Sequence, residues 1–312
     1  MIKVRFFPWW TTSYDFHLRI KKEFIGDHYS HKDITLVEDD SYDYAIVCCF
    51  TKENLKTDKN HTIYFFMEPH WSVNWDREAY KKSSRVFVTS KELYGNYDEY
   101  IEHKNFMPYG GKGYDAAYNI NDILNYSNTI KNKNFSSVIT NREASPLDGR
   151  TEGNLYMQRT NFVANLMKAG FDFDAYGFFW ENHDIKSKQN KGTICSMQKV
   201  LAIEPYRFSL AIENTSEKNY ITEKFYDPVY YNCVPVYFGA PNITEQPDIG
   251  NIAVVLKDIR SNDTFEENLN ILKSLDEAVY NNKMQNIMQL KKTLFESPEH
   301  SIWQRVIKEV TK

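Results

Sequence analysis

The stretch from Ser209 to Asn242 reads SLAIENTSEKNYITEKFYDPVYYNCVPVYFGAPN and decides the fold. It begins with an apolar run, Leu210–Ile212, which is typical of a buried parallel strand, and then turns polar. A helix is expected next, with Thr222 as its N-cap and Glu223 in its first turn. A second apolar run, Val234–Phe238, ends in a turn cluster. This order predicts a βαβ unit whose polar residues lie at the carboxyl ends of the strands, where open α/β sheets bind ligands.

The polar residues of this unit suit a ligand that carries both hydroxyl groups and a diphosphate. A helix N-terminus attracts phosphate, and Lys224 adds a positive charge there. Glu223 can accept hydrogen bonds from sugar hydroxyls, and Asn214 and Tyr220 supply further donors. A nucleotide sugar combines these features. An exposed ion pair beside a helix cap explains the spacing alone equally well.

Three parts of the stretch resemble the donor-binding motif of family 10 glycosyltransferases, the α1,3/4-fucosyltransferases. They are Glu213-Asn-Thr, then Tyr220-Ile-Thr-Glu-Lys224, then Val234-Pro-Val-Tyr-Phe-Gly-Ala-Pro241. The resemblance covers the C-terminal half well and the N-terminal half thinly. It implies a GT-B fold, in which two Rossmann-like domains face each other across a cleft. It also implies GDP-fucose as the donor and inversion at the anomeric carbon of the sugar.

The length of 312 residues favours two domains. We expect an acceptor-binding domain over 1–128, a donor-binding domain over 134–295, and a polar linker near 122–134. By analogy with GT-B proteins, a C-terminal helix in 296–312 is expected to pack on the N-terminal domain.

Short apolar runs separated by polar helical stretches predict a parallel sheet with crossover helices in each half. The expected strands are Ile2–Phe7, Ile34–Val37, Tyr44–Phe50, Thr62–Met67, Arg85–Thr89, Phe135–Thr140 and Ile252–Leu256. The expected helices are Asp15–Ile25, Leu155–Ala169, Ser196–Ile203, Asp263–Tyr280, Asn282–Phe295 and Ser301–Val310.

Composition narrows the class of partner. The net charge is −4, and no basic stripe is present, so a nucleic-acid partner is not expected. No apolar run approaches the roughly 20 residues that cross a bilayer, and the N-terminus lacks the pattern of a signal peptide. The cysteines, Cys48, Cys49, Cys195 and Cys233, have no metal-ligand spacing. We therefore expect a soluble cytoplasmic protein without disulfides.

Glu68 is the candidate general base because it follows the apolar run Thr62–Met67 and precedes Pro69. Position alone favours an ordinary solvated loop glutamate. In the resembled family, a glutamate after the corresponding strand deprotonates the acceptor hydroxyl, and this implies the same role for Glu68.

His70, Trp71 and Trp75 follow closely and could line an acceptor cleft, since aromatic faces stack on sugar rings. Packing of the loop onto the core is the commoner use of such side chains. On the predicted helix Leu155–Ala169, Arg159 can bind a diphosphate through its forked guanidinium, although helix arginines are usually solvated or paired. The segment QRTNFVANL around Arg159 resembles the family helix that binds the diphosphate.

The sequence thus predicts an inverting fucosyltransferase that moves L-fucose from GDP-fucose to a glycan acceptor, of the GlcNAc or LacNAc type by family resemblance. Glu68 is the expected base, and Arg159, Asn214, Tyr220, Glu223 and Lys224 are expected to hold the donor. No cofactor is expected, and cationic side chains are expected to replace a divalent metal. The alternative is a catalytically silent carbohydrate- or nucleotide-sugar-binding protein of the same fold.

Overall fold

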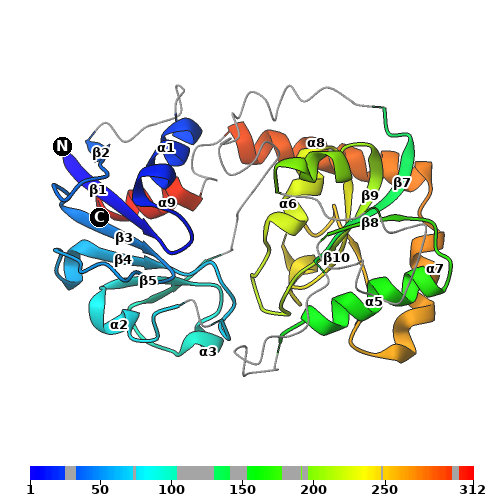
Figure 1. The fold of residues 1–312 in the computed structure, drawn as a ribbon, viewed down its shortest axis with the longest axis horizontal. Helices are drawn as coiled ribbons and strands as arrows, with labels where there is room; N and C mark the ends of the chain where they lie inside the picture. Colours follow the sequence, from blue (N-terminus) through cyan, green and yellow to red (C-terminus); the bar gives the residue numbers. More distant parts are fainter. Residues whose placement is uncertain are drawn as a thin grey trace.

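The computed structural model describes residues 1–24, 33–72, 75–103, 130–140, 153–177, 191, 196–246, 249–296 and 302–312. Two parallel sheets organise these residues (Figure 1). The first has the strand order β2-β1-β3-β4-β5-β6, and the second has the order β11-β10-β9-β7-β8. Every strand pair in both sheets is parallel, as the alternation of apolar runs and helices predicts.

The N-terminal sheet consists of buried strands joined by short helices. Its strands are β1 (Ile2–Pro8), β2 (Ile34–Leu36), β3 (Tyr44–Cys48), β4 (Thr62–Phe65), β5 (Arg85–Val88) and β6 (Tyr100–Glu102). Its helices are α1 (Ser13–Phe24), α2 (Ala79–Lys82) and α3 (Lys91–Tyr94). The predicted strands agree with β1 to β5, whereas β6, α2 and α3 were not predicted. The three missed elements are only three or four residues long, too short to show a hydrophobic period.

The C-terminal sheet has β9 at its centre, as expected for the apolar run that decides the fold. Its strands are β7 (Lys133–Val138), β8 (Asp174–Tyr176), β9 (Tyr206–Ile212), β10 (Val234–Phe238) and β11 (Val254–Val255). Its helices are α5 (Tyr156–Lys168), α6 (Glu223–Tyr230), α7 (Phe265–Lys273) and α8 (Glu277–Glu296). Figure 1 shows α5 beside α7, apart from α6 and α8. This layering buries the sheet between helices.

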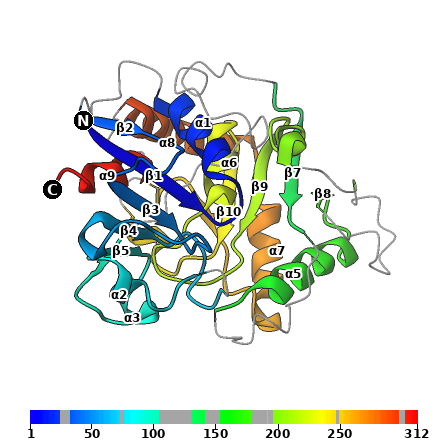
Figure 2. The ribbon, with the colours of Figure 1, turned by 60° about the vertical axis from the view of Figure 1, so that its left-hand side comes forward.

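The last helix of the chain, α9 (Ile302–Glu309), belongs to the core of the first sheet. The Trp303 ring lies 5.7 Å from that of Phe6 and 4.9 Å from that of Phe16. Val306 and Ile307 are fully buried in the same cluster. Figure 2 shows α9 close to β1 and β3. The C-terminal end of the described chain therefore completes the N-terminal hydrophobic core.

Two predicted helices differ from the structure. The helix predicted over Asp263–Tyr280 divides, because α7 ends at Lys273 and the Asp276 carboxylate accepts a hydrogen bond of 2.9 Å from the Val279 amide, which caps a new helix. The helix predicted over Ser196–Ile203 is a 3₁₀ helix, Ser196–Ala202. The greater part of the predicted linker and Cys195 lie outside the described residues. Among the described helices, none is long and apolar enough for a bilayer crossing.

Lys291 of α8 is a buried amine that ties this helix to the end of α6. Its Nζ donates to the Tyr230 carbonyl at 2.9 Å and to Asn232 Oδ1 at 2.8 Å. Burial lowers the pKa of Lys291 from its usual 10.5 to about 8. The unfolded chain therefore binds more protons than the folded protein between these two pH values, and stability must rise with pH in that window.

We expect the free energy of unfolding of the wild type to increase, relative to that of Lys291→Met, as the pH rises from about 8 to about 10.5. The increase should be on the order of 1 kcal/mol per pH unit at most. Urea denaturation of both proteins across this range measures it. A difference that stays constant across the window would show that the amine is not desolvated in the folded protein.

Candidate functional site

The ends of β9 and β10 bring the residues of the decisive stretch together. Ile212 pairs with Phe238 in the sheet, and the Glu213 amide donates to the Phe238 carbonyl at 2.9 Å. Glu213 is therefore the first residue beyond a buried strand end, beside Gly239. A Cβ at Gly239 would stand 2.4 Å from the Glu213 side chain, so only glycine leaves room for this carboxylate.

Glu213 fixes the start of α6. Its carboxylate is completely buried and accepts hydrogen bonds of 2.7 Å from both the amide and the hydroxyl of Thr222. The Thr222 hydroxyl in turn accepts from the Lys224 amide, which confirms Thr222 as the predicted N-cap. Burial raises the pKa of Glu213. The sequence analysis did not assign Glu213 this structural role, although its place as the first polar residue after an apolar strand was the available signal.

Lys224 and Glu223 form an ion pair at this helix start. The Lys224 amine lies 2.9 Å from Glu223 Oε1 and 3.6 Å from Glu213 Oε2. Burial opposes the charge on Lys224, but the carboxylates of Glu223 and Glu213 raise its pKa. Burial likewise opposes the charge on Glu223, but Lys224 and Lys199 lower its pKa to about 2. Lys224 and Glu223 therefore stay ionised near neutral pH, and the Lys224 amine is shared between the carboxyl groups of Glu223 and Glu213.

Lys199 is a second cation close to this cluster. Its amine donates to the buried carboxylate of Asp227 on α6, and its charge helps to keep Glu223 ionised. The spacing of the sequence gives no sign of this residue, because Lys199 lies in the 3₁₀ helix before β9 and meets α6 only in the folded chain.

Arg159 and Asn214 present buried polar atoms that the described part of the protein leaves unsatisfied. Arg159 is 5% exposed, and its guanidinium lies 4.5 Å from the ring centre of Tyr156. Its Nε has no hydrogen-bond partner there, and neither has Oδ1 of Asn214. Burial lowers the pKa of Arg159. Because buried polar atoms are normally paired, this pattern indicates a site for a polar ligand.

Tyr220, in the loop after β9, lies near Glu68, which follows β4 of the N-terminal sheet. The tyrosine is 3% exposed, and burial and then the nearby Glu68 carboxylate raise its pKa well above the usual value. The Glu68 backbone is held by the Tyr94 hydroxyl, which donates to its carbonyl oxygen. Glu68 lies three residues beyond the end of β4 rather than directly at it. The structure thus brings Glu68 and Tyr220 together from sequence positions far apart.

The predicted acceptor residues lie at the boundary between the two domains. Trp71 is 4% exposed, and its Nε1 donates to the Thr215 hydroxyl at 3.0 Å. Trp75 is 9% exposed and donates to the His70 carbonyl at 2.7 Å. These contacts agree with the alternative use of these side chains, which is to pack the loop onto the core. The acceptor role of His70, Trp71 and Trp75 remains a prediction.

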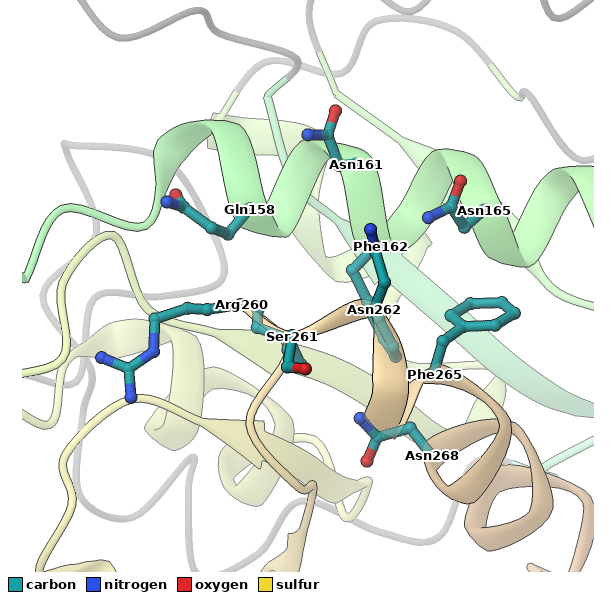
Figure 3. A pocket seen from close by; sticks show the side chains of 10 residues that line it. Gln158, Asn161, Phe162, Asn165, Arg260, Ser261, Asn262, Phe265 and Asn268 are labelled. Carbon is teal, nitrogen blue, oxygen red and sulfur yellow. The ribbon is translucent and has the colours of Figure 1, made fainter.

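A surface pocket of about 50 Å³ lies between α5 and the start of α7 (Figure 3). Gln158, Asn161 and Asn165 line it from α5, and Arg260 and Ser261 lie opposite. None of the predicted site residues lines this pocket. It is therefore separate from the site described above.

Comparison with protein families gives one match. Residues 144–301, about half of the chain, match the C-terminal region of glycosyltransferase family 10 (fucosyltransferase). This range contains the decisive stretch together with Arg159.

Individual relatives match over shorter segments. Alpha-(1,3)-fucosyltransferase B of Drosophila melanogaster is 30% identical over 131 residues, which are 41% of this chain and 29% of that protein. A putative fucosyltransferase-like protein of Arabidopsis thaliana is 40% identical over 87 residues, 28% of this chain and 15% of that protein. GDP-fucose protein O-fucosyltransferase 3 of Mus musculus is 36% identical over 88 residues, 28% of this chain and 18% of that protein. The matched segments thus span less than a third of each of these relatives.

Solved structures share the fold over most of the chain. An α1,3-fucosyltransferase crystallised with GDP superposes with a TM-score of 0.52 at 15% identity, covering 95% of this chain and 90% of that one. A DNA-modifying β-glucosyltransferase superposes with a TM-score of 0.58 at 12% identity, covering 99% of both chains. The predicted GT-B fold is confirmed by these superpositions and by the two parallel sheets.

Proposed function

The chain belongs to glycosyltransferase family 10, the fucosyltransferases, and on that premise we propose that it transfers L-fucose from GDP-fucose to a glycan hydroxyl with inversion. The observation that carries the proposal is the buried polar cluster at the start of α6. Carboxyl groups, an amine and a guanidinium with an unsatisfied Nε gather there, and Tyr220 lies near both this cluster and Glu68.

The donor is proposed to lie between Arg159 and the start of α6. Arg159 and Lys224 suit the diphosphate, because both carry charge in a site largely shielded from water. The ionised Glu223 can accept hydrogen bonds from sugar hydroxyls. Asn214 and Tyr220 border the same space from the loop after β9.

The reaction that this arrangement supports is a direct displacement. The acceptor oxygen attacks the anomeric carbon of fucose on the face opposite the diphosphate, and the bond from that carbon to the diphosphate oxygen breaks. Glu68 takes the proton of the acceptor hydroxyl, and GDP leaves with the bonding electron pair. Arg159 and Lys224 stabilise the negative charge that develops on the departing diphosphate.

Because these cations supply this stabilisation, chelation of divalent metal ions by EDTA should leave the rate of transfer nearly unchanged.

The acceptor is proposed to be a glycan with a free hydroxyl beside an N-acetyl group. The names of the relatives include both an alpha-(1,3)-fucosyltransferase and a protein O-fucosyltransferase. A panel of N-acetylglucosamine, N-acetyllactosamine and serine- or threonine-containing peptides therefore tests the acceptor directly. Transfer to peptide alone would replace the glycan assignment.

We expect GDP to raise the melting temperature of the protein, while UDP, ADP and CMP leave it unchanged. A ligand that binds only the folded state adds about 2.7 kcal/mol of stability at one hundred times its dissociation constant. Thermal denaturation with each nucleotide measures the effect, and mass spectrometry after incubation with GDP-fucose and the acceptor panel measures transfer. Equal stabilisation by UDP would refute the donor assignment, and stabilisation by GDP without any transfer would favour the silent binding protein.

A further inference from the structure

Glu217 places a buried carboxylate at the boundary between the two domains. It belongs to the loop after β9, and its side chain is 0% exposed. Its hydrogen bonds in the described part of the chain come from the N-terminal domain: the Thr89 hydroxyl donates to Oε1, and the His70 amide donates to Oε2 at 3.0 Å. A carboxylate is costly to bury unless several donors compensate it. The hydrogen bonds from Thr89 and His70 therefore hold the loop that contains Glu68 and His70 against the C-terminal domain.

The same carboxylate determines which nitrogen of the His70 ring carries the proton. Nδ1 of His70 lies 2.9 Å from Oε2 of Glu217. That oxygen already accepts the His70 amide, and an ionised carboxylate can only accept hydrogen bonds. Nδ1 must therefore donate. In the neutral ring Nε2 then has no proton and is a hydrogen-bond acceptor.

Nε2 is the polar atom of His70 that remains available. The amide and Nδ1 bond to Glu217, and the carbonyl accepts from Trp75 at 2.7 Å. Within the described residues, Nε2 makes no hydrogen bond, and the side chain is 13% exposed. The backbone of His70 is held by two hydrogen bonds and its ring by one, and Nε2 is left as an acceptor.

The His70 ring lies in the loop that carries the proposed base and close to the donor domain. His70 is two residues from Glu68. Its ring lies 6.3 Å from that of Tyr94, whose hydroxyl donates to the Glu68 carbonyl. On the other side, Cε1 of His70 would lie 3.8 Å from a Cβ added to Gly153 of the donor domain. Neighbouring hydroxyls of one sugar ring stand close enough together to contact two such groups at once.

We propose that His70 binds the acceptor and that Glu217 positions it: Glu217 fixes the ring with the proton on Nδ1, and Nε2 accepts a hydrogen bond from a sugar hydroxyl adjacent to the one that attacks. In this arrangement His70 is an acceptor-binding residue and Glu217 is a positioning residue. The acceptor contact rests on the proposed function, whereas the pairing of Glu217 with His70 does not.

Nitrogen-15 NMR of the imidazole rings tests the pairing without any substrate. The wild type should show His70 protonated on Nδ1, with His70→Asn used to assign the signal. Glu217→Gln should keep this tautomer, because its amide oxygen can accept both His70 donors while its NH₂ donates to the Thr89 hydroxyl. Glu217→Ala should lose it. A wild-type ring protonated on Nε2, or an unchanged ring in Glu217→Ala, would overturn the pairing.

Kinetics of His70→Asn test the acceptor contact. The asparagine amide can keep the donor to Glu217 but has no atom in the place of Nε2. We expect the KM for the acceptor to rise at least about tenfold, with GDP affinity and melting temperature unchanged. Glu217→Gln should keep the wild-type KM. An unchanged KM in His70→Asn, or a raised KM in Glu217→Gln with the tautomer kept, would refute the proposal. Absence of transfer to any acceptor by the wild type would refute the proposed function and leave the NMR result standing.

Discussion

Glu68→Gln should lower the rate of fucosyl transfer by about 10²- to 10⁴-fold, the usual contribution of general acid–base catalysis. Glutamine keeps the shape of the side chain but cannot take up the proton of the acceptor hydroxyl at neutral pH. GDP affinity should barely change, because the proposed donor-binding residues belong to the other domain. Initial rates at saturating GDP-fucose, together with calorimetric titration of GDP, measure the two effects separately.

Glu78→Gln is the matched control. It is a glutamate of the same domain, 60% exposed in its side chain, whose ion pair is with Lys81. It should keep the wild-type rate. Near-normal turnover in Glu68→Gln would assign the base to another carboxylate, with Glu38, Asp39 and Asp40 the next to replace. Loss of GDP binding would instead place Glu68 in the donor pocket.

Lys224→Ala should lower the free energy of unfolding by about 3 kcal/mol, the lower end of the range for breaking a buried ion pair. The amine is shared by Glu223 and the fully buried Glu213, and its removal takes the ion-pair partner from both carboxyl groups. GDP affinity should fall as well, because the diphosphate loses a positive charge. Urea denaturation and calorimetric titration measure these losses. The sharing of this amine between two carboxyl groups is the reason to expect both losses.

Arg159→Met separates the contribution of a buried cation to GDP binding from its contribution to the stability of the fold. Arg159 is a buried cation with an unsatisfied Nε, so its charge costs stability when no ligand is bound. Methionine should therefore leave the free energy of unfolding unchanged or raise it, while GDP affinity falls at least about tenfold. Destabilisation equal to that of Lys224→Ala would show that Arg159 holds the fold rather than a ligand.

The elements that the sequence predicted well are those whose signal is local. The strand through Ile212 and the helix capped by Thr222 each depend on residues within a few positions, and both occur where expected. The division between α7 and α8 was missed because the Asp276 cap interrupts an apolar pattern that is otherwise continuous.

The contacts between domains were beyond sequence reasoning because they join distant positions. The contact between His70 and Glu217 spans 147 residues, and the one between Trp71 and Thr215 spans 144. The local sequence around each residue of such a pair is that of an ordinary loop and does not indicate its partner. Lys199 is similar, since only folding brings it to Asp227. Resemblance to a family supplied the roles of Glu68 and Arg159, but it could not supply Glu217, whose partners are visible only in three dimensions.

The packing of α9 has a consequence for the order of events during protein synthesis. Trp303, Val306 and Ile307 leave the ribosome after the whole C-terminal sheet, yet they fill the core between Phe6 and Phe16. Until they emerge, the nascent N-terminal sheet has an uncovered apolar face that chaperones can bind. The C-terminal domain, whose core needs no later segment, can fold first even though it is made second. The core of the N-terminal sheet can therefore be completed only after synthesis has reached α9.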